Sequence, residues 1–234
     1  VWSKPVVGTG LPTSWYAKAR EIVPTGADWS MRVDVICGEV PGLAVTSELI
    51  SPSTNAAYKQ ATVACDDGLF SLGGGIDIVG PEQNIAMISS TQKITSGDQG
   101  FRGSALDFGN PASASAWTVE AHALCTSVSG FEIVSSSTDS DGFDNKSAVV
   151  NCPSGTWPIS GGAFIAGDET NVAMKQSRPK DGAPGGLPVG WQADARATSG
   201  NWFLSVQAVC APIADPTVAN DALVARYRGA DAGF

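Results

Sequence analysis

The stretch WTVEAHALC (117–125) places a tryptophan eight residues before a cysteine, with alternating apolar side chains between them. Close versions stand at WSMRVDVIC (29–37) and WFLSVQAVC (202–210). Successive side chains of a β-strand point to opposite faces, so this alternation predicts a half-buried strand. The even spacing puts each Trp and Cys on the buried face. We therefore expect the chain to build the same strand three times.

A related segment precedes each of these strands, namely WYAKAR (15–20), FRGSAL (101–106) and WQADAR (191–196). Turn-forming residues, rich in Gly, Asn, Asp and Ser, separate the two members of each pair. Such residues between two apolar runs are typical of tight connections. Each pair is therefore predicted to form a hairpin.

Two further segments complete the repeat. KQATVAC (59–65) and KSAVVNC (146–152) each end in a cysteine and lead through a short turn into the glycine runs LGGGIDI (72–78) and ISGGAFI (159–165). Glycine within a strand pattern indicates a bulge or a close approach of another backbone. These runs lack the spacing and the lysine of a phosphate-binding loop.

The repeat predicts an all-β fold of pseudo-repeated antiparallel sheets. One arrangement is a single β-prism-like domain over 1–234 with threefold pseudosymmetry, in which units 15–107 and 108–196 are followed by an incomplete unit 197–234. The alternative is two tandem β-sandwich-like domains with a boundary near 108–116, each completed by an exchanged strand.

The five cysteines suggest disulfides and hence a secreted, extracellular protein. The pairs Cys37–Cys65 and Cys125–Cys152 would close loops of similar length in equivalent units. Cys210 is then left over, and its phase on the strand favours a buried free thiol over a bond to another chain.

Composition excludes two classes of partner. The net charge of −9 argues against nucleic acid, because phosphate binding requires clustered Lys and Arg. No run of 18 or more apolar residues occurs, so no membrane span is predicted.

The pattern K-x-A-x-V-x-C, a P-x-G or D-x-G turn, a Gly-Gly run and a Trp-to-Cys strand resembles repeats of small secreted actinobacterial proteins, a family of unassigned activity. Residues 59–75, 146–162 and the three Trp-to-Cys strands carry the resemblance, which covers roughly a quarter of the chain. A looser likeness to β-prism proteins of extracellular coats, through Gly pairs and repeated Trp residues, implies that fold and suggests glycan binding.

The acidic segment SSSTDSDGFDNKS (135–147) is the candidate metal site. Asp139, Asp141, Asp144 and Asn145 surround Gly142, and clustered oxygen ligands with a glycine turn suit calcium. The alternative is an acidic turn without metal, because Asp, Ser, Gly and Asn are common turn residues. No other cofactor is expected.

Trp157 is the candidate ligand-binding residue, because it lies outside the buried phase of the repeat and within a turn-rich segment. His122, the only histidine, is expected on the polar, solvated face of its strand. No catalytic residues are assigned, and the sequence leans away from an enzyme.

We expect a secreted, non-enzymatic surface-recognition module, with a glycan or another cell-surface component as its favoured partner. The alternative is a self-associating structural subunit of an extracellular filament, coat or virion surface. A third hypothesis is a hydrolase using carboxylates such as Asp66–Asp67 or Asp168–Glu169. The third hypothesis also includes a protease inhibitor that presents the loop RPKDGAPGGLP (178–188).

Overall fold

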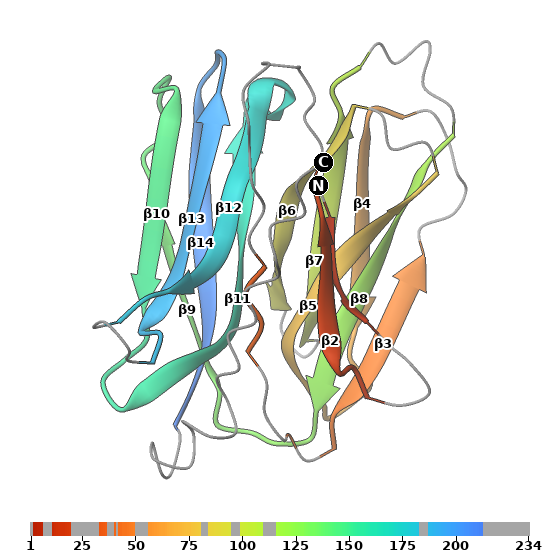
Figure 1. Ribbon diagram of the computed structural model, residues 1–234, viewed down its shortest axis with the longest axis vertical. Helices are drawn as coiled ribbons and strands as arrows, with labels where there is room; N and C mark the ends of the chain where they lie inside the picture. Colours follow the sequence, from red (N-terminus) through yellow and green to blue (C-terminus); the bar gives the residue numbers. More distant parts are fainter. Residues whose placement is uncertain are drawn as a thin grey trace.

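The computed structural model describes residues 2–6, 11–19, 33–36, 40, 42–49, 56–80, 84–94, 99–109, 116–182 and 187–212. Within these ranges the protein is all-β, with fourteen strands and one short 3-10 turn at Glu169–Asn171 (Figure 1). None of the described residues forms a helix of the length and hydropathy needed to cross a membrane.

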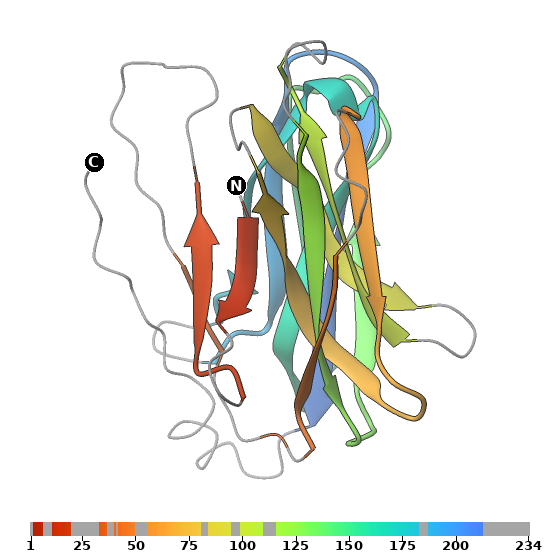
Figure 2. The same ribbon diagram turned by 90° about the vertical axis from the view of Figure 1, so that its right-hand side faces the viewer.

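Twelve of the strands form two six-stranded units of the same topology. The first unit comprises β3 (Ala44–Leu49), β4 (Tyr58–Ala64), β5 (Phe70–Val79), β6 (Ile85–Ile94), β7 (Gln99–Asp107) and β8 (Thr118–Thr126). The second comprises β9 (Glu132–Ser137), β10 (Asn145–Asn151), β11 (Thr156–Gly167), β12 (Val172–Lys180), β13 (Gly190–Ala197) and β14 (Trp202–Pro212). The remaining two, β1 (Trp2–Val6) and β2 (Ser14–Lys18), form an N-terminal hairpin that stands beside the first unit (Figure 2).

Each unit is a sandwich of two three-stranded sheets. In the first unit β5-β8-β3 faces β4-β7-β6, and in the second β11-β14-β9 faces β10-β13-β12. A separate apolar cluster fills each sandwich, around Trp117 in the first and Trp202 in the second. Period-two alternation produces these cores, because one face of every strand carries the apolar side chains.

Neighbouring units share sheets. Strand β6 pairs with β11, which joins the two units in a six-stranded sheet of order β4-β7-β6-β11-β14-β9. Strand β1 pairs with β5 in the same way, giving a five-stranded sheet of order β2-β1-β5-β8-β3. The third sheet, β10-β13-β12, has no added strand among the described residues.

The predicted hairpins are wrong where the structure describes them. FRGSAL lies on β7 and WTVEAHALC on β8, and these strands belong to opposite sheets; WQADAR on β13 and the strand after Trp202 are divided in the same way. Alternation shows only that two strands face a common core, a condition that facing sheets meet as well as neighbouring strands do. Residues 33–36, the described part of the first Trp-to-Cys segment, lie outside any strand.

The repeat also has a different phase from the predicted units. The first sandwich ends at Thr126 and the second begins at Glu132, so the connection is 127–131. Units starting at 108 and 197, and the alternative boundary near 108–116, would instead separate the sixth strand from the other five. The threefold arrangement stays a prediction, because two complete units lie within the described residues.

The predicted disulfide pairs are wrong. The structure contains Cys65–Cys125 and Cys152–Cys210, with Cα–Cα distances of 5.7 Å in both. Each bond joins the end of the Lys-bearing strand to the Trp-to-Cys strand of the facing sheet, within one unit. Cys210 is therefore bonded rather than free, and Cys37, which lies outside the described residues, is the fifth cysteine. The prediction paired cysteines that are close in sequence, whereas the sandwich brings together cysteines that are 58 to 60 residues apart.

The other end of the same two strands is held by a buried lysine. Lys59 on β4 donates a hydrogen bond to the Trp117 carbonyl oxygen, and its Nζ lies 4.8 Å from the centroid of that indole ring. Lys146 on β10 lies 5.1 Å from the Trp202 ring. Burial lowers the pKa of Lys59 below its ordinary value. We call the lysine, tryptophan and disulfide of each unit its clasp.

The disulfide assignment predicts a large loss of stability when a bond is removed. For the Cys152→Ala/Cys210→Ala double variant we expect the free energy of unfolding to fall by about 4 kcal/mol, because a loop of this length restricts the unfolded chain. Urea unfolding measures this change. Peptide mapping of the unreduced protein should recover both observed pairs, and a Cys37–Cys65 peptide would contradict the assignment.

Candidate functional site

Two contacts add a neighbouring strand to the edge strand of a unit, and both depend on the glycine pairs of the repeat. In one, Ser3 of β1 is opposite Ile76 of β5; in the other, Ser90 of β6 is opposite Ala163 of β11. Ile76 and Ala163 occupy the same position of the two repeats, and each follows a Gly-Gly pair. We call each of these strand-to-strand contacts a junction.

Glycine makes the junctions possible. A Cβ on Gly75 would overlap the carbonyl oxygen of Ser3, and a Cβ on Gly162 would overlap that of Ser90. Both overlaps are with backbone, which cannot rotate out of the way. The sequence predicted a bulge or a close approach of another backbone at these runs; Gly75 and Gly162 show the close approach, and a register irregularity precedes each pair.

The preceding glycine of each pair serves the unit's own core. A Cβ on Gly74 would overlap the Phe101 ring, and a Cβ on Gly161 would overlap the Trp191 indole. Phe101 and Trp191 begin the segments FRGSAL and WQADAR, so they are equivalent residues of the repeat. The Gly-Gly pair therefore admits an aromatic ring on one side and a neighbouring strand on the other.

Charged and polar side chains add to the β1–β5 junction. The Lys4 ammonium on β1 forms an ion pair with the Asp77 carboxylate on β5. Within the hairpin, the Trp15 indole Nε1 donates to the Ser3 hydroxyl at 2.5 Å. The junction thus combines backbone pairing, a glycine and a cross-strand charge pair.

His122 lies on β8 near this junction and is buried, with 7% of its surface exposed, so the expectation of a solvated residue is wrong. Strand β8 is the central strand between β5 and β3, and both of its faces are covered. Burial lowers the pKa of His122; the Glu120 and Asp77 carboxylates oppose this shift, and Lys4 adds to it. The Nε2 atom lies 3.8 Å from a Glu120 oxygen.

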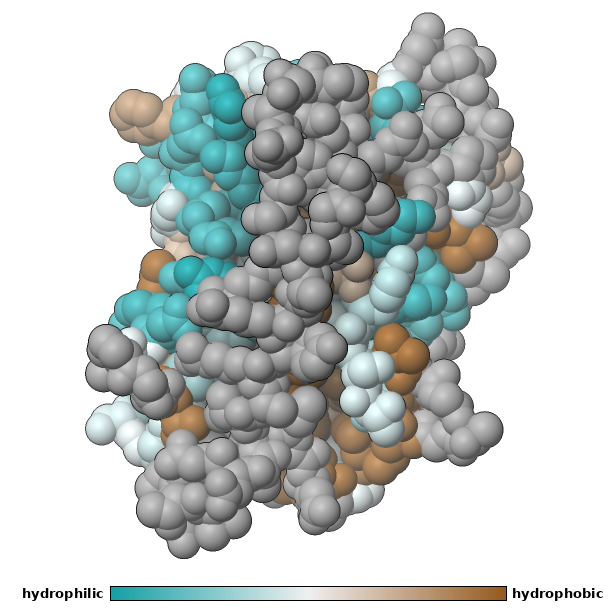
Figure 3. Space-filling view, viewed as in Figure 1, coloured by the Kyte–Doolittle hydropathy of each residue, from teal (hydrophilic) through white to brown (hydrophobic). Residues whose placement is uncertain are grey.

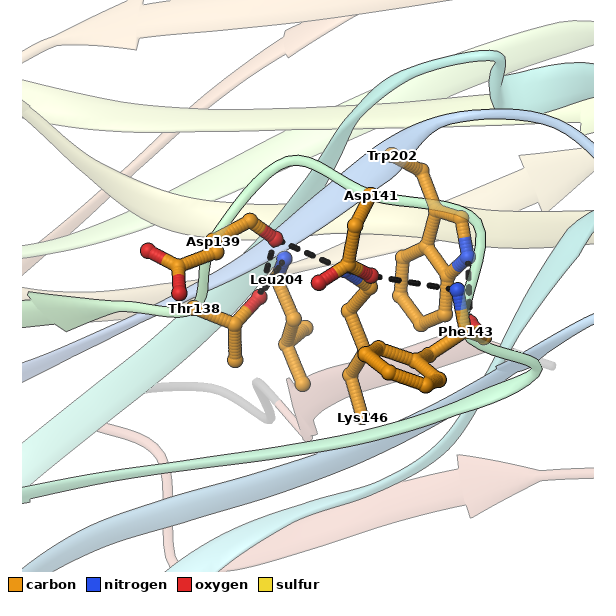
Figure 4. A network of polar contacts seen from close by, with 7 residues as sticks. All are labelled: Thr138, Asp139, Asp141, Phe143, Lys146, Trp202 and Leu204. Carbon is orange, nitrogen blue, oxygen red and sulfur yellow. Dashed lines mark hydrogen bonds and ion pairs between the residues drawn. The ribbon is translucent and has the colours of Figure 1, made fainter.

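The acidic segment closes around the second clasp (Figure 4). Lys146 donates to the Asp139 carbonyl oxygen at 2.7 Å and to Asp141 Oδ1 at 2.5 Å. The Trp202 indole donates to the Phe143 carbonyl oxygen at 3.0 Å. The hydrogen bond from Lys146, and then that from the Phe143 amide, lowers the pKa of the Asp141 carboxyl.

This geometry assigns the acidic segment a structural role. Asp141 is committed to Lys146, and the Asp139 carboxylate points away from it (Figure 4). Asp144 and Asn145 are exposed. No group of three or more His, Cys, Asp or Glu side chains within the described ranges is arranged to hold a metal ion. Calcium binding at these four residues stays a prediction without structural support.

Trp157 lies at the start of β11, opposite Ala211 of β14, and is half-buried. Its equivalent Phe70 is also half-buried at the start of β5. The repeated aromatic position favours packing, and a half-buried indole offers less of its face for stacking on a sugar ring. Glycan binding at Trp157 therefore stays a prediction.

The proposed carboxylate pairs lie in exposed turns. Asp66 and Asp67 follow β4, and Asp168 follows β11; all three are exposed, while the Glu169 side chain lies outside the described set. Residues 183–186 of the predicted inhibitor loop are likewise outside it. Sequence reasoning singled out none of the junction residues as a site, although the Gly-Gly pairs were the signal that marks them.

Comparison of the chain with protein-family models, with characterised proteins and with solved structures finds no match.

Substitution of a junction glycine tests the close approach. We expect Gly162→Ala to lower the free energy of unfolding by about 2–3 kcal/mol, because the added Cβ forces the β6 and β11 backbones apart. Gly142→Ala is the matched control, since the nearest atoms to its Cβ would be Asn201 Oδ1 at 3.4 Å and the Gly200 carbonyl oxygen at 3.7 Å, neither of which it would overlap. Equal urea midpoints for the two variants would contradict the junction geometry.

His122 predicts a pH-dependent stability. Because its pKa is lowered, the unfolded chain binds a proton at a higher pH than the folded chain does, and stability falls as the pH drops below about 6.5. His122→Gln should reduce the loss in free energy of unfolding between about pH 7 and pH 5. The control is the unsubstituted protein measured in the same buffers, and identical slopes would refute the assignment.

Proposed function

We propose that this protein is a structural subunit of an extracellular assembly, one that associates through the edges of its β-sheets. The observation that carries the proposal is the junction itself. The chain uses the same strand-to-strand contact twice, between β1 and β5 and between β6 and β11. A contact that recurs with each repeat is a general way of adding one unit to the next.

The repeat leaves a sheet edge available for such a contact. Strand β12 holds in the second unit the place that β6 holds in the first, and no strand in the described part of the chain pairs with its outer edge. Exposed edges are templates for pairing with another chain, and proteins usually protect them. An edge that the repeat pattern marks for pairing suits a subunit of an assembly.

The clasps fit an extracellular setting. Two disulfides stabilise the two units, and such bonds persist in oxidising surroundings. Each disulfide connects the two sheets of a sandwich, so each unit keeps its shape while its outer edges engage neighbours. A rigid unit with open edges is what an extended assembly requires.

Self-association is the direct test. We expect the weight-average mass in sedimentation velocity to rise with protein concentration under non-reducing conditions, because pairing at sheet edges is a mass-action equilibrium. A parallel series with Cys37→Ser, which removes the one cysteine outside the two observed pairs, separates edge pairing from intermolecular disulfides. A protein that stays monomeric at every concentration would refute the proposal.

A further inference from the structure

Hairpin β12–β13 reproduces the N-terminal hairpin β1–β2. The pairing register is the same, with Pro5 opposite Trp15 in one hairpin and Pro179 opposite Trp191 in the other. The Trp191 indole donates to the Ser177 hydroxyl at 2.9 Å, as Trp15 does to Ser3. These hairpins are therefore equivalent in backbone pairing and in side-chain contacts.

The equivalence extends to the residues that form the junction. Strand β1 carries Ser3-Lys4-Pro5, and β12 carries Ser177-Arg178-Pro179, so serine, a basic residue and proline recur in the same order. In the N-terminal hairpin this sequence meets Ile76 and Asp77 of β5. The outer edge of β12 pairs with no strand among the described residues, so its copy of the sequence meets no described counterpart.

We propose that the outer edge of β12 is an acceptor for an extended strand of another polypeptide, and that this strand has the chemistry of β5: a glycine pair, an apolar residue and then an acid. This inference deepens the assembly function proposed above and rests on it. The edge, centred on Ser177, defines the docking surface.

The glycine requirement follows from the two occupied junctions. In both, the residue before the paired Ile76 or Ala163 is a glycine whose Cβ would overlap a serine carbonyl oxygen. Ser177 occupies the position of those serines. An incoming strand with a side chain at that point would meet the β12 backbone, so glycine selects the partner and its register.

The acid requirement follows from Arg178. It stands where Lys4 stands in β1, and Lys4 is paired with Asp77. Arg178 forms an ion pair with Asp181 at 3.1 Å and donates to Gln176 Oε1 at 3.2 Å, and an incoming carboxylate would take the place of Asp181 beside it. Lys175 and Lys180 on the same strand donate to Asn145 and Asn151 of β10, across the sheet from this edge, so Arg178 is the residue that supplies positive charge where Lys4 does in β1. Charge complementarity therefore favours an acidic strand.

The polar character of the β10-β13-β12 sheet also favours pairing by backbone. Hydrophilic side chains gather over the β10-β13-β12 sheet (Figure 3). A partner gains little there by burying apolar surface, and main-chain hydrogen bonds along the edge supply the affinity, as in other cases of strand addition.

The probe is a labelled peptide of residues 70–79, FSLGGGIDIV, added to the full-length protein and followed by fluorescence anisotropy. We expect saturable binding, and no measurable binding of the same peptide with Gly75→Val. The Asp77→Lys peptide should bind about fivefold more weakly, in line with loss of one exposed charge pair.

Charge reversal on the protein locates the site. Arg178→Glu should weaken the natural peptide and restore the Asp77→Lys peptide, while the matched control Lys175→Glu should not restore it. Circular dichroism establishes that both variants are folded. Restoration by Lys4→Glu instead would show that the peptide had replaced β5 beside β1, and would overturn the proposal. An affinity that is unchanged by Gly75→Val in the peptide or by Arg178→Glu in the protein would overturn it as well.

The two proposals fail separately. Peptide binding by a protein that stays monomeric would support the β12 acceptor and refute self-association. Self-association by a protein that does not bind the peptide would support the assembly function and refute the β12 acceptor.

Discussion

The fold depends on a buried lysine held against a tryptophan across each sandwich. Taking an ammonium group out of water is costly, and the structure compensates with a carbonyl oxygen and an indole face at Lys59, and with Asp139, Asp141 and the Trp202 ring at Lys146. A disulfide fixes the opposite end of the same strands. Two strands from facing sheets are thus held at both ends, and the remaining strands pack around them.

The clasps allow the glycine pairs to serve a second purpose. A Gly-Gly pair in a strand weakens it, because glycine contributes no side chain and gains freedom when the chain unfolds. The clasped core offsets that cost, since β8 and β14, which lie beside these glycines, are anchored at both ends. The glycines are then free to bring a neighbouring strand close. Within one repeat, the clasp residues therefore provide stability and the glycine pair provides the strand-to-strand contact.

Particular residues show how far the sequence reaches. The alternation around Trp117 and Trp202 identified buried strands, because burial of one strand face is a local, periodic property. The same alternation failed for His122, since a central strand can be covered on both faces. It also failed for the disulfides, because the sequence does not say which strands face one another. The acidic segment has the composition of a metal-binding loop, but two of its oxygens accept hydrogen bonds from Lys146, the lysine of the second repeat unit.

The sequence alone determined an all-β chain, its repeat of Lys, Gly-Gly, Trp and Cys positions, and the glycines that mark close backbone approach. These follow from side-chain period and backbone sterics, which act over a few residues. Tertiary structure alone decided that each Trp-to-Cys strand lies in the sheet facing the strand before it, and that Cys65 bonds Cys125 and Cys152 bonds Cys210. It also decided that hairpin β12–β13 repeats hairpin β1–β2. Those outcomes depend on which distant strands share a core, and local patterns leave that choice open.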